Sequence, residues 1–160
     1  MIEKLAFQNI YDFEKALKLF KKEKIQCWVN CPRREYKIYK QIKMENKTNT
    51  QLSIDVSGCK WNLASNSIHF FDLFYFLVNI PVNFSKKKND LKKILSKHNK
   101  FFELTGKLRI KDKKFGISLS DKSKNKGIVV KIKTSKARYY IDEYKNFVRV
   151  YLGNKTYTRK

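Results

Sequence analysis

The chain has 160 residues, and 37 Lys and Arg residues against 14 Asp and Glu residues give it a formal net charge of +23. This length suits one domain, or a small domain with an extension, and excludes a large multidomain enzyme. A hydrophobic fraction of 42% excludes a disordered basic tail, because such a tail lacks the apolar area needed to fold. The excess of positive charge favours a polyanionic partner, most commonly nucleic acid, over an anionic membrane surface.

The N-terminal residues and the cysteines favour a protein that works in the compartment where it is made. No basic segment followed by an apolar core opens the sequence, so no secretion signal is expected. The apolar run 70–80 has about half the length of a membrane-spanning helix, so no membrane partner is expected. Cys27, Cys31 and Cys59 are odd in number and include no Cys-x2-Cys pair, which argues against disulfides and against a zinc site completed by His69. We therefore expect neither a metal nor another cofactor.

A helix followed by strands is predicted for residues 1–64. Apolar residues at positions i, i+3, i+4 and i+7 of the segment 13–20 predict an amphipathic helix with lysines on its outer face, which Asn9 or Asp12 could cap. Polar turns then separate three expected strands, over residues 25–30, 35–44 and 51–56.

Two further helices are expected in the middle of the chain. The segment 69–79 is apolar nearly all round, residues 65–67 can cap it, and a proline follows it, so it belongs inside a core. The segment 91–102 carries its apolar residues on one stripe, with Ser85 or Asn89 as the cap and lysines on the outer face.

From residue 106 the apolar positions alternate with polar ones, which predicts strands. These strands are expected over residues 106–111, 115–119, 128–133 and 148–152. Burial of the apolar positions would place five cations together on the other face, namely Lys107, Arg109, Lys111, Lys131 and Lys133. The predicted fold is α+β: a small antiparallel sheet packed against helices, with a basic outer face and an α/β N-terminal extension. The extension covers residues 1–64 and an RNA-binding domain covers residues 65–160.

Three groups of side chains are candidates for contact with nucleic acid. Lysines 86–88 would lie in the first turn of the helix that carries the apolar stripe of residues 91–102, where free backbone N–H groups and ammonium groups together could hold a phosphate. The five cations of the sheet face could follow a phosphate backbone by charge. Guanidinium and aromatic groups suited to stacking on bases occur at Arg33, Arg34, Arg138, Tyr139 and Tyr140, and Lys136 adds a cation beside them. Solvated charges and tyrosines in the core are the plain alternatives.

Parts of the second half resemble a known family. Residues 72–79, Asp-Leu-Phe-Tyr-Phe-Leu-Val-Asn, are similar to the Asp-Leu-Leu-x-x-Ile-Arg-Asn helix that opens the small-subunit ribosomal protein eight family of bacteria and organelles. Residues 82–86 and the helix with Leu91 are similar to the family's extended segment into Ser-Lys and its Ile-Leu helix. Residues 132–140 resemble its Ile-Ser-Lys-Pro-Gly-Arg-Arg-x-Tyr segment. The Ser-Thr-Ser-Lys-Gly signature of the family's C-terminal part is missing.

The resemblance implies a structural constituent of the small ribosomal subunit, in a mitochondrion or otherwise in the cytoplasm. Its partners would be ribosomal RNA and neighbouring small-subunit proteins, with no small-molecule substrate and no reaction catalysed. The residues expected to contact RNA are Ser85, Lys86, Lys88, Lys92, Lys107, Arg109, Lys131, Lys133, Ser135, Lys136, Arg138, Tyr140, Arg33 and Arg34.

Two alternatives remain open from the sequence. Residues 11–80 are expected to run helix, three strands, helix, which is the element order of a double-stranded RNA-binding module. A phage or plasmid DNA-processing enzyme is the other alternative, with Tyr139, Tyr140 or Tyr144 as nucleophile, although the two histidines lie 29 positions apart.

Overall fold

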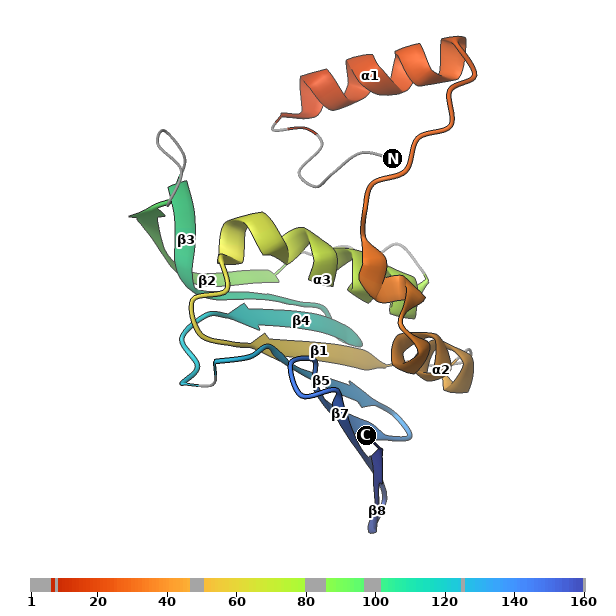
Figure 1. The fold of residues 1–160 in the computed structure, drawn as a ribbon, viewed down its shortest axis with the longest axis vertical. Coiled ribbons are helices and arrows are strands. Elements are labelled where there is room, and N and C mark those ends of the chain that lie inside the picture. The colour runs from red at the N-terminus through yellow and green to blue at the C-terminus, as the bar shows by residue number, and fades with distance from the viewer. Residues whose placement is uncertain are drawn as a thin grey trace.

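The computed structural model describes residues 7, 9–46, 51–79, 86–96, 102–124 and 126–159. As predicted, the fold is α+β (Figure 1). Within these residues, one sheet of eight strands carries two helices on one of its faces, and a further helix lies apart from both. No helix in the described part of the chain is long and apolar enough to cross a membrane.

The sheet is larger than the sequence predicts, and it is mixed rather than purely antiparallel. Its strand order is β2-β3-β4-β1-β5-β6-β7-β8, and β1 pairs parallel with β4 and antiparallel with β5. The first strand in the chain therefore lies at the centre of the sheet. The strands are β1 (Leu52–Ser57), β2 (Lys86–Leu95), β3 (Phe102–Lys111), β4 (Phe115–Ser120), β5 (Val129–Thr134), β6 (Arg138–Asp142), β7 (Phe147–Leu152) and β8 (Lys155–Arg159).

One face of the sheet is covered by helices, and the hydrophobic core lies between the two layers. The helix α3 (Leu63–Val78) packs on β3, β4 and β1, and the short η1 (Pro32–Glu35) and α2 (Lys37–Glu45) pack beside it (Figure 1). Alternate strand residues such as Ile54, Ile117 and Ile132 point into this core. The period-two pattern of the strands thus places apolar side chains under the helices and leaves polar ones on the opposite face.

For two segments the sequence predicts the wrong type of element, a strand in place of a helix and a helix in place of a strand. The segment 35–44 was expected as a strand but is mainly helix α2, with Tyr39 and Ile42 fully buried. The segment 91–102 was expected as a helix, but β2 runs from Lys86 to Leu95 and pairs along its whole length with β3. Helical spacing of apolar residues is a weak signal in a Lys-rich segment, and the backbone pairing of ten residues outweighs it.

The N-terminal helix agrees with its prediction but lies apart from the rest. It is α1 (Ile10–Lys22), and the Asn9 side chain accepts a hydrogen bond from the Asp12 backbone N–H at 2.8 Å, as a cap should. Helix α1 has no buried residue and contacts no other described helix or strand (Figure 1). The segment 25–30, expected as a strand, forms only a single bridge at Val29.

Candidate functional site

The uncovered face of the sheet is cationic, as the sequence predicts. The register places Lys107, Arg109 and Lys111 of β3 on this face, because Leu108 and Ile110 pair with the core residues of β4. Lys131 and Lys133 of β5 lie on the same face, since Val130 and Ile132 are buried beneath the helices. The face of the sheet that carries these five cations is called the open face below.

A hollow of about 700 Å³ lies on the open face. Its floor comes from the adjacent strands β4 and β1, whose open-face residues are the small Gly116, Ser118 and Ser53 together with Asp55. Its sides come from β3 on one flank and from β5, β6 and β7 on the other. We call this hollow the open-face groove. Two residues predicted from the sequence, Arg138 and Tyr140, line it as well.

The phosphate site predicted at a helix start is wrong. Lys86 to Lys88 open the strand β2, so they have no helix N-terminus beside them. Ser85 lies outside the described residues. Lys92 is exposed on β2, and Ser135 and Lys136 are exposed in the β5–β6 turn. None of the three lines the open-face groove. Contact of these residues with nucleic acid stays a prediction.

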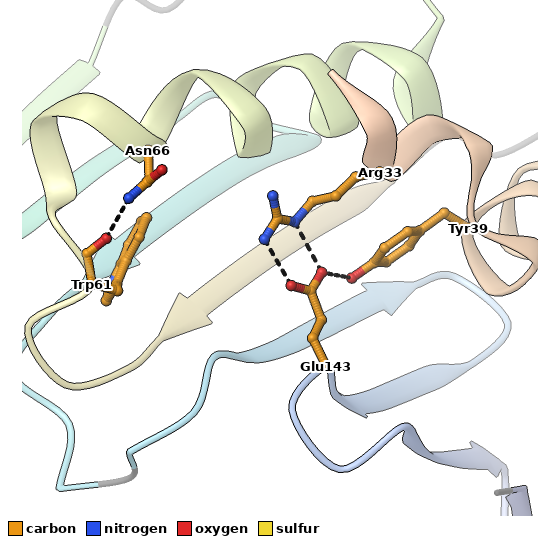
Figure 2. Close-up of polar contacts among 5 residues, drawn as sticks. All are labelled: Arg33, Tyr39, Trp61, Asn66 and Glu143. Atoms are coloured by element: carbon orange, nitrogen blue, oxygen red, sulfur yellow. Dashed lines mark hydrogen bonds and ion pairs between the residues drawn. The ribbon is translucent and has the colours of Figure 1, made fainter. Parts of the chain in front are cut away.

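Arg33 has a structural environment that the sequence does not reveal. Its Nε and Nη2 atoms donate hydrogen bonds to both carboxylate oxygens of Glu143, at 2.9 and 2.7 Å (Figure 2). The side chains are only 12% and 15% exposed, and the guanidinium also lies 4.1 Å from the centre of the Phe70 ring. The Tyr39 hydroxyl donates to the same carboxylate at 2.8 Å. Arg33 therefore links η1 to the β6–β7 turn, and its guanidinium group has a structural role.

Two buried tyrosines have perturbed ionisation for a related reason. Burial, and then the neighbouring Glu143 carboxylate, raise the pKa of Tyr39 well above its usual value of 10. Burial and the hydrogen bond to Glu45, at 2.7 Å, raise the pKa of Tyr139 to about 12. A nucleophilic tyrosine would need the opposite shift, and Tyr139 is a buried residue of the core.

Helix α3 carries a polar row beside its apolar face. Ser65, His69 and Asp72 follow at i, i+4 and i+7, which places them on one side of a helix, and all three are half-buried. Arg34 pairs with Asp72 through two hydrogen bonds, one of them from Nε at 2.9 Å. We call Ser65, His69, Asp72 and Arg34 the α3 polar row. The spacing of Ser65, His69 and Asp72 is visible in the sequence, but the apolar residues around them favour a helix that only forms part of the core.

The start of α3 is held from several sides. The Glu103 carboxylate of β3 accepts from the backbone N–H groups of Ala64 and Ser65, at 2.9 and 3.4 Å. Such a carboxylate suits the positive end of the helix dipole. The Asn66 side chain donates to the Trp61 carbonyl at 2.7 Å (Figure 2). These contacts fix the end of α3 from which the polar row begins.

No protein-family model matches the chain, and no curated protein matches its sequence. Solved structures match its fold. A dehydrogenase from Clostridium difficile has a TM-score of 0.70 at 22% identity, over 99% of this chain and 53% of that chain. A Gfo/Idh/MocA family oxidoreductase from Vibrio cholerae has 0.69 at 14% identity, over 98% and 52%. A UDP-N-acetylglucosamine 3-dehydrogenase from Acidithiobacillus ferrooxidans has 0.64 at 12%, over 99% and 54%. The chain spans about half the length of these proteins, and the likeness is one of fold.

These matches overturn the ribosomal interpretation. Nearly the whole chain has the fold of part of these oxidoreductases, so the resemblance to ribosomal protein eight is wrong. The ribosomal RNA partner, the neighbouring ribosomal proteins, and the exclusion of catalysis and of a small-molecule substrate are corrected with it. The physical reason lies in β2, because the segment that was matched to the family's second helix is a strand.

The two alternative functions are corrected by the same matches. The double-stranded RNA-binding module also fails on element order, because η1, α2 and β1 stand where three strands were expected. The DNA-processing enzyme also fails at one of its candidate nucleophiles, because Tyr139 is buried in the core.

Proposed function

We propose that this chain is the substrate-binding half of an oxidoreductase of the Gfo/Idh/MocA type, and that another polypeptide region supplies the dinucleotide-binding half. One observation carries the proposal: nearly all of this chain matches about half of each solved dehydrogenase. A half of such an enzyme has either the cofactor or the substrate as its main ligand.

The residues of this chain do not fit a dinucleotide. Binding of that cofactor commonly uses a parallel sheet and a Gly-x-Gly-x-x-Gly turn between a strand and a helix. The five glycines of this sequence, at positions 58, 106, 116, 127 and 153, lie too far apart to form that turn. Among the described strands only β1 and β4 pair in parallel. The substrate is therefore the ligand assigned to this half.

The α3 polar row is the proposed substrate site. One of the matched proteins is described as a dehydrogenase of UDP-N-acetylglucosamine, and oxidation of an alcohol requires a group that takes up the hydroxyl proton. His69 is suited to that role because imidazole exchanges protons near neutral pH. Asp72 and Arg34, paired beside it, can accept from and donate to the hydroxyl groups of a sugar.

Helix α1 is the proposed contact for the dinucleotide-binding half. Its apolar residues Ile10, Phe13 and Leu17 are 73%, 45% and 38% exposed, and they share one side of the helix. Trp28, in the segment that follows, is 62% exposed. An amphipathic helix that contacts no other helix or strand of the described residues gains stability when a second domain covers this stripe.

Chemical-shift mapping of the full chain, labelled with nitrogen-15, tests the substrate site. Neutral sugars such as N-acetylglucosamine should shift the backbone amide signals of residues 65–72. Arg34→Ala should weaken this binding by about tenfold, because it removes a charge-assisted hydrogen-bond donor. Lys18→Ala, an exposed change on α1, should leave the binding unaltered. NADH should give no saturable shift.

Two outcomes would reject the proposal. Saturable binding of NADH by the isolated chain would make it the cofactor half. Sugar binding that shifts other residues, and that Arg34→Ala leaves unchanged, would remove the α3 polar row from the site. Hydrogen exchange provides a separate test of α1, whose amides should exchange faster than those of α3 in the isolated chain.

A further inference from the structure

The side of α3 that carries the α3 polar row continues to an aromatic residue with two cations beside it. Phe76 follows Asp72 by four positions, so both lie on the same side of the helix. The Lys43 ammonium of α2 is 4.0 Å from the centre of the Phe76 ring, and the Arg34 guanidinium of η1 is 5.7 Å from it. Both η1 and α2 pack against α3 (Figure 1). One half-buried ring therefore brings together cations from two other elements.

The charge of Lys43 is not neutralised by the acidic residues of its own segment. Glu35 pairs with Lys40 at 2.6 Å, and Glu45 accepts a hydrogen bond from Tyr139 at 2.7 Å. None of the salt bridges among the described residues includes Lys43. Its ammonium is nevertheless half-buried and held over a ring, which lowers the entropy that a ligand would have to remove. Lys43 is thus a positioned cation that an anionic ligand could bind.

Arg34 retains donors that Asp72 does not use. Its Nε and Nη2 atoms bind the Asp72 carboxylate, whereas a guanidinium group has five N–H donors over three nitrogens. The Arg34 side chain is 44% exposed, so the Nη1 edge is open to a ligand. Asp72 fixes the plane of the guanidinium, and the remaining edge can donate to an anion in a defined direction.

The spacing along α3 favours a phosphate ester over a carboxylate. His69 and Phe76 are seven residues apart, which is about 10 Å along a helix. A carboxylate attached directly to a sugar ring lies close to the ring hydroxyls. An ester-linked phosphate extends farther from the hydroxyl on the opposite side of the ring, and it offers three acceptor oxygens. Arginine and lysine together are common ligands of such a group.

We propose that Lys43, Arg34 and Phe76 form a phosphate subsite, and that the substrate of the α3 polar row is a phosphorylated sugar. Lys43 Nζ and Arg34 Nη1 donate to the phosphate oxygens, and Phe76 holds Lys43 in place. The sugar then extends along α3, with its reacting hydroxyl at His69. This inference rests on the proposed function, because it names the substrate class of the same site.

Titration of the full chain labelled with nitrogen-15 tests the phosphate subsite. We expect N-acetylglucosamine 1-phosphate to bind at least about tenfold more tightly than N-acetylglucosamine, because the phosphate adds charge-assisted hydrogen bonds. Both sugars should shift the amide signals of residues 65–72, and the phosphorylated one should also shift those of residues 34 and 43. UDP-N-acetylglucosamine separates two sources of the phosphate: tighter binding than the monophosphate indicates a nucleotide sugar, and weaker binding indicates a simple monoester.

Variants of α2 and α3 separate the subsite from general attraction by a cationic protein. Lys43→Gln should weaken the 1-phosphate by about tenfold and change N-acetylglucosamine by less than about twofold. Lys37→Gln removes the same charge from an exposed position of the same helix, and it should change neither sugar by more than about twofold. Phe76→Leu removes the cation–π contact and should give an intermediate loss for the 1-phosphate alone. Circular dichroism checks that each variant is folded.

Three results would overturn the phosphate subsite. Equal affinity for the sugar with and without its phosphate would reject it, and would leave the proposed function intact if residues 65–72 still shift. Equal loss in Lys43→Gln and Lys37→Gln would mean that net charge alone attracts the ligand. Equal loss of both sugars in Lys43→Gln would mean that Lys43 supports the sugar site rather than the phosphate. Absence of binding by either sugar would reject the subsite and the proposed function together.

Discussion

The two faces of the sheet are built from the same strands and have opposite chemistry. On the covered face, Ile54, Val130 and Ile132 are at most 1% exposed and pack beneath α2 and α3. On the open face their chain neighbours Asp55, Lys131 and Lys133 face solvent or the groove. One alternation along the strand therefore specifies a core and a cationic surface at once. Stability should depend on the first face more than on the second.

Truncation on the covered face should have the largest effect. Ile54→Ala should lower the free energy of unfolding by about 3–4 kcal/mol, because it leaves a cavity in a tightly packed core. Ser53→Ala, the neighbouring residue on the open face, should change it by less than about 0.5 kcal/mol. Urea unfolding monitored by circular dichroism measures both. Equal losses at the two positions would show that the faces do not differ as described.

Loss of the Arg33–Glu143 ion pair should have the next largest effect on stability. Arg33→Ala should cost about 3 kcal/mol, because it leaves the Glu143 carboxylate largely buried with only the Tyr39 hydroxyl beside it. Lys40→Ala breaks the exposed Lys40–Glu35 pair and should cost less than about 0.5 kcal/mol. The difference in urea midpoint between the two variants gives the comparison. A small loss for Arg33→Ala would mean that water reaches this pair.

Ionisation of the Tyr139 hydroxyl should lower the stability of the folded chain at alkaline pH. Its pKa of about 12 in the folded chain exceeds the usual 10, so between these values the folded chain holds a proton that the unfolded chain has lost. Stability is therefore complete below pH 10 and falls as the pH rises towards 12. Tyr139→Phe should cost about 1 kcal/mol at neutral pH and make the alkaline fall shallower.

The matched measurement is urea unfolding of both proteins at pH 8, 10 and 11. Tyr39 titrates in the same direction in both, so it cancels in the difference between them. A parallel fall in the two proteins would show that Tyr139 is not the group responsible.

Removing positive charge from the open face should have the smallest effect on stability, and this effect should be a gain rather than a loss. Lys131→Gln with Lys133→Gln should raise stability by about 0.3 kcal/mol at low salt, because it reduces repulsion among cations. The gain should disappear as added sodium chloride screens the charges. A loss of stability would show that these lysines are already paired with acids in the free chain.

The sequence predicts the sheet face better than the layout of the elements. Alternation of Lys131, Ile132 and Lys133 fixes which side chains share a face, because period two is a local property of any strand. The same holds for α1, whose apolar spacing and Asn9 cap are complete within its own segment. Local patterns are therefore enough where the structure depends only on neighbours in sequence.

The failures concern partners distant in the chain. Segment 35–44 contains no local signal that Tyr39 would reach Glu143 or that Ile42 would be buried under a sheet. Segment 86–95 becomes a strand only because β3 lies beside it. The sequence does not predict the α3 polar row, because Arg34, which completes it, is 38 residues away from Asp72. Strand order and side-chain clusters depend on such long-range contacts, which periodicity does not encode.

The central position of β1 has a consequence for how the chain acquires its fold. Both of its neighbours, β4 and β5, are synthesised about sixty to eighty residues later, so the middle of the sheet cannot close until residue 134 has left the tunnel in which the chain is made. Until then an apolar strand has no lateral partners and is open to aggregation. Such long-range pairing slows folding, so chaperone assistance during translation should increase the yield of native chain.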